Sequence, residues 1–143
     1  MALISLVLLA AIAAVFYLFF SSVNQVIYKT AQIGNESFKL ELADTDAKRV
    51  KGLSERDSIG QNEGMLFDFK QDGNWKIWMV QMRFPIDIAW LDADKQIIHI
   101  KPNAKPADYP ETYKAPSLSR YVIEINSGEF ERLGVTVGDY ISF

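Results

Sequence analysis

The chain has 143 residues, 49% of them hydrophobic, and a net charge of −3 at neutral pH. This length allows one domain that buries its own apolar core. The absence of cysteine excludes disulfides, thiol chemistry and a lipid-modified cysteine anchor. Basic and acidic residues are interspersed and form no basic stripe, so we expect no nucleic-acid partner.

The N-terminal segment, residues 2–20, is apolar and carries no charged side chain. A helix of this length extends about 28 Å, close to the ~30 Å hydrocarbon core of a bilayer. No basic residue precedes the run and no suitable cleavage site follows it, so a cleaved signal peptide is the weaker alternative. We therefore predict a single-pass anchor in residues 1–22, which contacts the lipid bilayer through residues 2–20. As in a signal anchor, the domain would lie on the extracytoplasmic side.

Residues 23–34 form the predicted tether and first strand, and residues 35–143 the predicted globular domain. Gly34 and Asn35 are residue types that favour a two-residue hairpin turn. Short runs with alternating, β-branched or aromatic apolar residues predict strands over residues 38–42, 64–69, 75–82, 86–91, 97–100, 121–125 and 140–143.

Two short helices are predicted between these strands. Thr45 can cap a helix over residues 46–51 that ends at Gly52, and Ser127 can cap a second one over residues 128–133. Four prolines between residues 101 and 119 predict a long irregular loop. The pattern is typical of a mainly β domain, and we expect a compact sandwich or barrel, jelly-roll-like, with one or two short helices.

Six motifs in a fixed order resemble one protein family. They are GLSER (52–56), GMLF (64–67), WM (78–79), FPIDIAWLD (84–92), YVIEINSG (121–128) and GVTVGD (134–139). In this order they resemble the domain of unknown function, family 192, over about residues 35–143. The resemblance implies a compact, mostly β domain, often behind an export signal or membrane segment, with no agreed activity. The family commonly has Met where Ser54 stands, so a methionine-based role would not carry over.

Asp87 is the most informative polar residue, because it lies between two isoleucines in a predicted strand. A carboxylate in a partly desolvated place needs a partner, which Arg56 or Arg83 could supply as a guanidinium fork. We expect a structural role there, either in an ion pair or as a carboxylate that caps loop amides, and we keep a ligand-binding role for Arg56 and Asp87 as the alternative.

Glu124 is a second acid in a predicted strand. Together with Asp87 it would make the two carboxylates of a glycosidase, if the pair lay within about 5–9.5 Å. Two acids on two strands often coincide by chance, so Asp87 and Glu124 are weak catalytic candidates.

Aromatic residues could line a binding groove for a sugar or peptide. Trp75 follows a Gly-Asn turn, and Tyr109 and Tyr113 lie on the proline-rich loop, so we expect these three at a ligand-binding surface. Trp78 and Trp90 are expected in the core, where large aromatics supply most of the burial.

The sequence gives little support for a metal site or for a catalytic nucleophile. Three methionines (Met65, Met79 and Met82) fit gap-filling core positions better than a copper site. His99 is the only histidine and is expected to face solvent, which argues against zinc and against a serine–histidine pair. We expect no cofactor and no metal.

These observations favour a membrane-anchored, extracytoplasmic β-domain that acts as a binding or envelope-associated accessory module, with an unknown envelope ligand or protein partner. An enzyme is the second reading, namely a hydrolase that acts on cell-envelope polysaccharide through Asp87 and Glu124.

Overall fold

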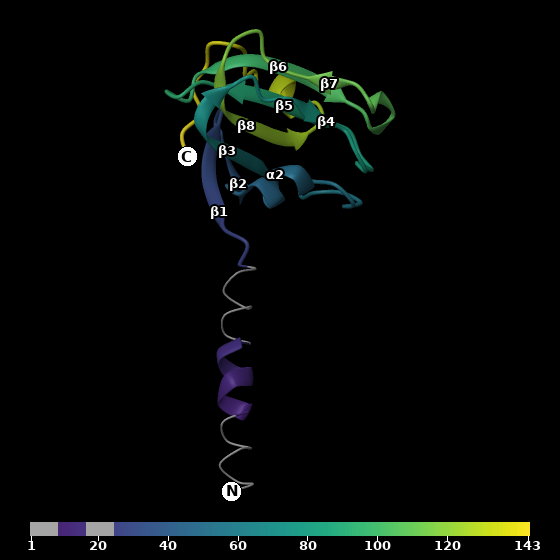
Figure 1. Ribbon diagram of the computed structural model, residues 1–143. Helices are drawn as coiled ribbons and strands as arrows, with labels where there is room; N and C mark the ends of the chain where they lie inside the picture. Colours follow the sequence, from purple (N-terminus) through teal and green to yellow (C-terminus); the bar gives the residue numbers. More distant parts are fainter. Residues whose placement is uncertain (1–8, 17–24) are drawn as a thin grey trace, which may run out of the picture.

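The computed structural model describes residues 9–16 and 25–143 (Figure 1). Residues 9–16 are helical. The predicted anchor over residues 2–20 lies partly outside the described residues. Within the two described ranges, no helix is long and apolar enough to cross a membrane.

The domain is mainly β and is built on one mixed sheet of six strands in the order β1-β2-β3-β8-β5-β6. Figure 1 shows these strands succeeding one another across a strongly curved sheet. Their bounds are β1 Tyr28–Ile33, β2 Glu36–Ala43, β3 Glu63–Gly73, β5 Ile86–Leu91, β6 Ile97–Ala104 and β8 Ser119–Asn126. Two further strands, β4 (Ile77–Trp78) and β7 (Thr112–Tyr113), form a separate antiparallel pair.

The sheet is mixed because β2 and β3 run parallel, while all its other neighbours are antiparallel. A parallel pair needs a crossover connection, and α2 (Asp46–Lys51) lies in the segment that joins these two strands. The predicted jelly roll, with two packed antiparallel sheets, is therefore replaced by a single curved mixed sheet with a small side sheet. The sequence signals for individual strands could not distinguish the two arrangements.

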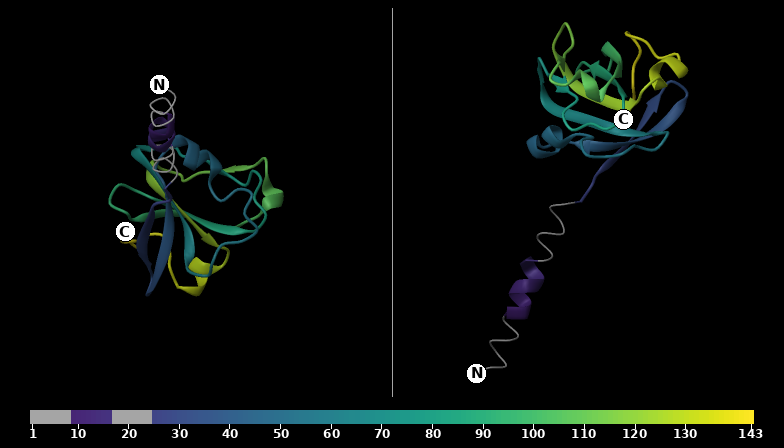
Figure 2. Two further views of the ribbon diagram at one scale, coloured as in Figure 1. Left: turned by 90° about the horizontal axis from the view of Figure 1, so that it is seen from below. Right: turned by 90° about the vertical axis from the view of Figure 1, so that its right-hand side faces the viewer.

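Both faces of the sheet are buried. Alternate residues of β8 make this plain, since Ile123 and Ile125 belong to one apolar cluster and Val122 to the other. The first cluster includes Phe130 of α3 (Glu129–Arg132). The second is covered from the α2 side and includes Leu53, just after that helix. Figure 2 shows α2 and α3 on opposite sides of the sheet.

The predicted helices form, but only one has the predicted cap. Thr45 caps α2 by accepting from the amide of Lys48 at 3.3 Å. The N-cap position of α3 is taken by Gly128, in the left-handed conformation at φ 86°. Glycine has no side chain that could cap the helix. Ser127 instead donates to the side chain of Asn103.

The C-terminal segment does not form the predicted strand over residues 140–143. It makes isolated bridges at Tyr140 and Ser142. Ser142 accepts from the amide of Gln32 in β1 at 2.9 Å, and Ile141 donates to the carbonyl of Lys95, just before β6. The segment thus links the two edges of the curved sheet at one end, which gives the domain a partly barrel-like closure.

Candidate functional site

A pocket of about 360 Å³ opens on the α2 side of the sheet. Its size lies within the range of small-molecule sites in proteins, about 300–1,000 Å³. The lining comes from α2 and the turn after it, from β3, from the segment around β4, and from Glu124 of β8. These residues are Asp46, Arg49, Val50, Lys51, Gly52, Leu53, Ser54, Phe67, Phe69, Gln71, Trp75, Lys76, Ile77, Trp78, Met82 and Glu124.

Glu124 is the most buried polar side chain that lines this pocket, with only 4% of its surface exposed. Alternation along β8 turns it toward the α2 side, where Met65 of β3 and Ile88 of β5 lie directly opposite it in the neighbouring strands. Among the described residues, its carboxyl group makes no hydrogen bond and no ion pair. A polar group buried in this way normally has a partner, so its position against an open pocket calls for a ligand or water.

The environment of Glu124 favours its neutral form. Burial raises the pKa of the Glu124 carboxyl to about 8, and the positive charge of Arg56 lowers it only in part. Desolvation disfavours the charged carboxylate, which explains the direction of the change. At neutral pH the group is therefore a carboxylic acid, which can donate one hydrogen bond and accept others.

The sequence suggested Arg56 as a partner of Asp87, but the two do not pair. Its guanidinium contacts Glu41 of β2 at 2.7 Å. Register places Glu41 opposite Met65, and Met65 opposite Glu124, so the two glutamates lie in one row of the sheet. Arg56 therefore neutralises Glu41 and leaves Glu124 without a bonded counter-charge.

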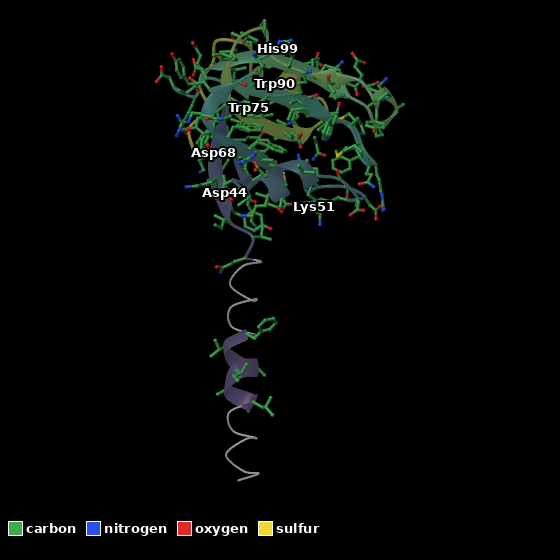
Figure 3. The ribbon with its side chains drawn as sticks, in the orientation of Figure 1. Asp44, Lys51, Asp68, Trp75, Trp90 and His99 are labelled. Atoms are coloured by element: carbon green, nitrogen blue, oxygen red, sulfur yellow. The ribbon has the colours of Figure 1, made fainter. Side chains whose placement is uncertain are left out.

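An aromatic wall forms one side of the pocket. The ring of Trp75 stacks on Phe69 at a centroid distance of 4.1 Å and an interplanar angle of 7°. Trp75 is the one predicted contact residue that lies in this pocket. Its carbonyl also accepts from the indole of the buried Trp90 at 3.0 Å, and Figure 3 shows the two side chains near each other.

Trp78 corrects a second expectation. Trp90 is fully buried as predicted, but Trp78 is 48% exposed and lies at the pocket. The reason is that residues 75–82 do not form one buried strand, because only Ile77 and Trp78 pair, in the small side sheet. Ile77 faces inward, and alternation turns Trp78 outward.

The charged side chains of the pocket are mostly basic. Arg49 is satisfied, since it contacts Asp46 at 2.6 Å and donates to the carbonyl of Asp68 at 2.7 Å. Lys51 at the end of α2 (Figure 3) and Lys76 are exposed, and neither has a partner among the described residues. The pocket thus has an apolar interior, one neutral acid and unpaired positive charge at its mouth.

Asp87 has a structural role that the sequence indicated, with different partners. It is 1% exposed and accepts three backbone N–H groups, those of Asn103 at 2.9 Å, Gly128 at 2.9 Å and Phe130 at 3.3 Å. Asp87 therefore caps α3 from β5 and fastens the end of β6. These bonds occupy the carboxylate and leave Arg83 to pair with Asp57.

The two acids of the hydrolase hypothesis do not come together. Asp87 lies opposite Ile125, whereas Glu124 lies opposite Ile88. Successive side chains of a strand point to opposite faces, so the two carboxylates lie on opposite sides of the sheet.

The two tyrosines predicted at the site do not line the pocket. Tyr109 is 52% exposed, on the segment between η1 (Pro106–Asp108) and β7. Tyr113 donates to Asp108 at 2.7 Å, and burial together with this acidic partner raises the pKa of its phenol well above the usual range. Neither tyrosine lines the pocket at Glu124.

Soft and metal-binding groups serve packing in this structure. The three methionines lie in the second apolar cluster. His99 was expected to face solvent, but it is half-buried against Trp90, at a distance of 5.4 Å between the ring centroids. In residues 9–16 and 25–143, no group of three or more His, Asp or Glu could hold a metal ion.

Comparison with known proteins assigns the fold but no activity. The family model of the domain of unknown function 192, described as an uncharacterised ACR, matches residues 28–143. The chain is similar to UPF0127 proteins of Thermococcus kodakarensis (30% identity over 105 residues) and Thermococcus gammatolerans (32% over 104 residues), each over 73% of its length. It spans 64% and 65% of those relatives, just under two thirds of their length.

Two solved structures share the architecture. One is a crystal structure of a "putative transcription regulator" from Sinorhizobium meliloti, with 28% identity and a TM-score of 0.78 over 82% of this chain and 95% of that one. The other is a protein of unknown function from Novosphingobium aromaticivorans, with 31% identity and a TM-score of 0.74 over 83% and 86% of the two chains.

Proposed function

This chain belongs to the domain-of-unknown-function family 192, and we propose that its domain is a binding module whose ligand enters the pocket at Glu124. The observation that supports this proposal is Glu124 itself, a carboxyl group that is 4% exposed, unpartnered among the described residues, and aimed into a pocket of about 360 Å³. Ligand sites typically combine apolar walls with a few convergent polar groups.

A binding role fits this pocket better than hydrolysis. Glycoside hydrolysis needs two carboxylates that flank one bond, whereas among the described residues Glu124 is the only carboxyl group in the interior of this pocket. The acid predicted as its partner, Asp87, holds three backbone amides on the other face. A hydrolase that uses Asp87 and Glu124 on cell-envelope polysaccharide is thus the weaker proposal.

A nucleic-acid partner is also the weaker proposal. The description of the Sinorhizobium meliloti protein as a regulator concerns that protein. Here the net charge is −3, and six of the basic side chains form ion pairs with acids. Neither feature provides the phosphate-binding stripe that nucleic acids require.

We also propose that the domain works at a membrane, on the extracytoplasmic side. The uncharged apolar run over residues 2–20 supports this, because its length matches the hydrocarbon core of a bilayer. Residues 21–25 contain no charge and would serve as the tether.

The binding proposal is tested with the chain from Val26 onward. Both apolar clusters lie within it, and the Sinorhizobium meliloti chain, 95% of which aligns with this one, folds with little beyond the shared domain. The uncharged probe 2-naphthamide is titrated into the protein and followed by NMR. The backbone amide chemical shifts of α2, β3, β4 and β8 should change and reach saturation. Trp78→Ala should weaken binding severalfold, whereas Tyr109→Ala, a matched exposed aromatic, should not. Shifts confined to the Tyr109 loop, or none that saturate, would contradict the proposal.

A further inference from the structure

The chemical character of the pocket changes from its mouth to its interior, and this gradient identifies a class of ligand. Lys51 and Lys76 are exposed at the mouth, and Glu124 is the buried polar group at the inner end. Resting on the proposed binding function, we infer that the ligand is a small anionic amphiphile. Its anionic group pairs with Lys51 and Lys76, its apolar ring-sized body fills the pocket, and a hydrogen-bond acceptor at its far end meets the Glu124 carboxyl.

The apolar body follows from the walls. Leu53, Phe67, Phe69, Ile77 and Met82 line the interior, and Trp78 closes one side from the surface. Burying a ring against such walls releases about 25 cal/mol for each Å² of apolar surface removed from water. The flat stack of Trp75 on Phe69, with an interplanar angle of 7°, fixes one wall in place before a ligand arrives.

The acceptor at the inner end follows from the state of Glu124. A neutral carboxyl group offers an O–H donor, and no described residue takes it up. A carbonyl, ether or hydroxyl oxygen of the ligand would accept that hydrogen bond. A ligand that is wholly apolar there would leave a buried donor unsatisfied, which is unfavourable.

The negative charge follows from the balance of the lining. The basic lining residues are Arg49, Lys51 and Lys76, and the acidic residue at the mouth, Asp46, already pairs with Arg49. Arg56 lies near Glu124 but is paired with Glu41, so the unpaired positive charge comes from Lys51 and Lys76. An aromatic pocket can also attract an alkylammonium ion by cation–π interaction, but the unpaired lysines oppose a cation.

Three matched probes separate these features in the chain from Val26 onward. The first, 6-methoxy-2-naphthoate, carries the anion, the rings and the far-end acceptor. The second, 6-methoxy-2-naphthamide, lacks only the charge, and the third, 2-naphthoate, lacks only the acceptor. Binding is measured by NMR, from the chemical shifts of the protein's backbone amides, at pH 7 and moderate salt. We expect millimolar dissociation constants for probes of this size, with the first probe binding about three- to tenfold more tightly than the second.

Variants assign the charge preference to the mouth. The double variant Lys51→Gln/Lys76→Gln should abolish the preference for naphthoate over naphthamide and leave naphthamide binding unchanged. Lys29→Gln/Lys114→Gln is the matched control, because both lysines are exposed, lack partners among the described residues, and lie outside the pocket. Glu124→Leu should remove the advantage of the methoxy probe over 2-naphthoate.

The outcomes distinguish this inference from the proposed function. If the amide binds in the pocket as tightly as the acid, or the lysine variant keeps the preference, the anionic class is wrong while the binding site stands. If none of the probes binds in the pocket, the proposed function itself fails. Vesicles of phosphatidylglycerol that displace the bound naphthoate would assign the same chemistry to a membrane lipid, and a lack of displacement would assign it to a free molecule.

Discussion

Replacing Glu124 by glutamine should stabilise the domain at alkaline pH, although the residue is buried. Burial raises the pKa of its carboxyl from the ordinary 4.5 to about 8. Folding at a pH between these values must therefore take up a proton at Glu124. Over this interval the free energy of unfolding falls with rising pH, by about 1.4 kcal/mol per pH unit. The total loss reaches up to about 5 kcal/mol once the pH exceeds both pKa values.

Glutamine has nearly the same shape and cannot ionise. We expect Glu124→Gln to match the wild type within about 1 kcal/mol near pH 5 and to be about 3–5 kcal/mol more stable near pH 8. The difference between the two proteins isolates Glu124, since groups shared by both cancel. Arg56 is the one charged side chain that acts appreciably on Glu124, and it is unchanged in the variant.

The assay is urea unfolding of the chain from Val26 onward at pH 5, 6, 7, 8 and 9, followed by tryptophan fluorescence. Free energies of unfolding are compared from the urea midpoints, with one common m-value for all variants. Glu131→Gln is the control, because Glu131 is exposed and its side chain has no partner among the described residues. Parallel pH profiles would show that burial does not raise the pKa of Glu124. A variant that is less stable than the wild type at pH 8 would show that Glu124 is ionised and paired in the folded protein, and either result refutes the reasoning.

Three further predictions concern the stability of the sheet and the membrane location of the chain. Asp87→Asn should cost about 2–4 kcal/mol in urea unfolding, because a charged acceptor of three buried amides is lost; an unchanged midpoint would contradict this. Gly64→Ala should cost about 3 kcal/mol, because a Cβ there would lie 2.3 Å from the carbonyl oxygen of Glu124; an unchanged melting temperature would show that the strands can separate. The full chain should stay in membranes after a carbonate wash and be digested by protease outside the cell; full protection would place the domain inside.

Local features of the fold could be predicted from the sequence because short-range chemistry determines them. Thr45 and Gly52 delimit α2 as expected, and the turn at Gly34 joins β1 to β2. The parallel pairing of β2 with β3 could not be predicted, since it depends on where the chain returns after α2. The predicted irregular loop also starts too early, because β6 continues through Pro102. An edge strand tolerates proline, and only the sheet order shows that β6 is an edge strand.

The site was only partly predictable. Trp75 and Glu124 were candidates, but the pocket that joins them depends on tertiary packing. Lys51 and Lys76 gave no signal, because an exposed lysine with a role looks like any other exposed lysine. For Asp87 the sequence offered an ion pair or a cap on loop amides; the second is what forms, but which amides it binds could not be predicted, because they come from distant parts of the chain.

The carboxyl group of Glu124 can be observed directly by ¹³C NMR through a pH titration, with and without 6-methoxy-2-naphthoate. Without the probe it should titrate near pH 8. With the probe its pKa should rise further, because a ligand that accepts a hydrogen bond from the neutral acid binds that form preferentially. A titration near 4.5 that the probe leaves unchanged would contradict the account, since Glu124 would then be neither desolvated nor part of a ligand site.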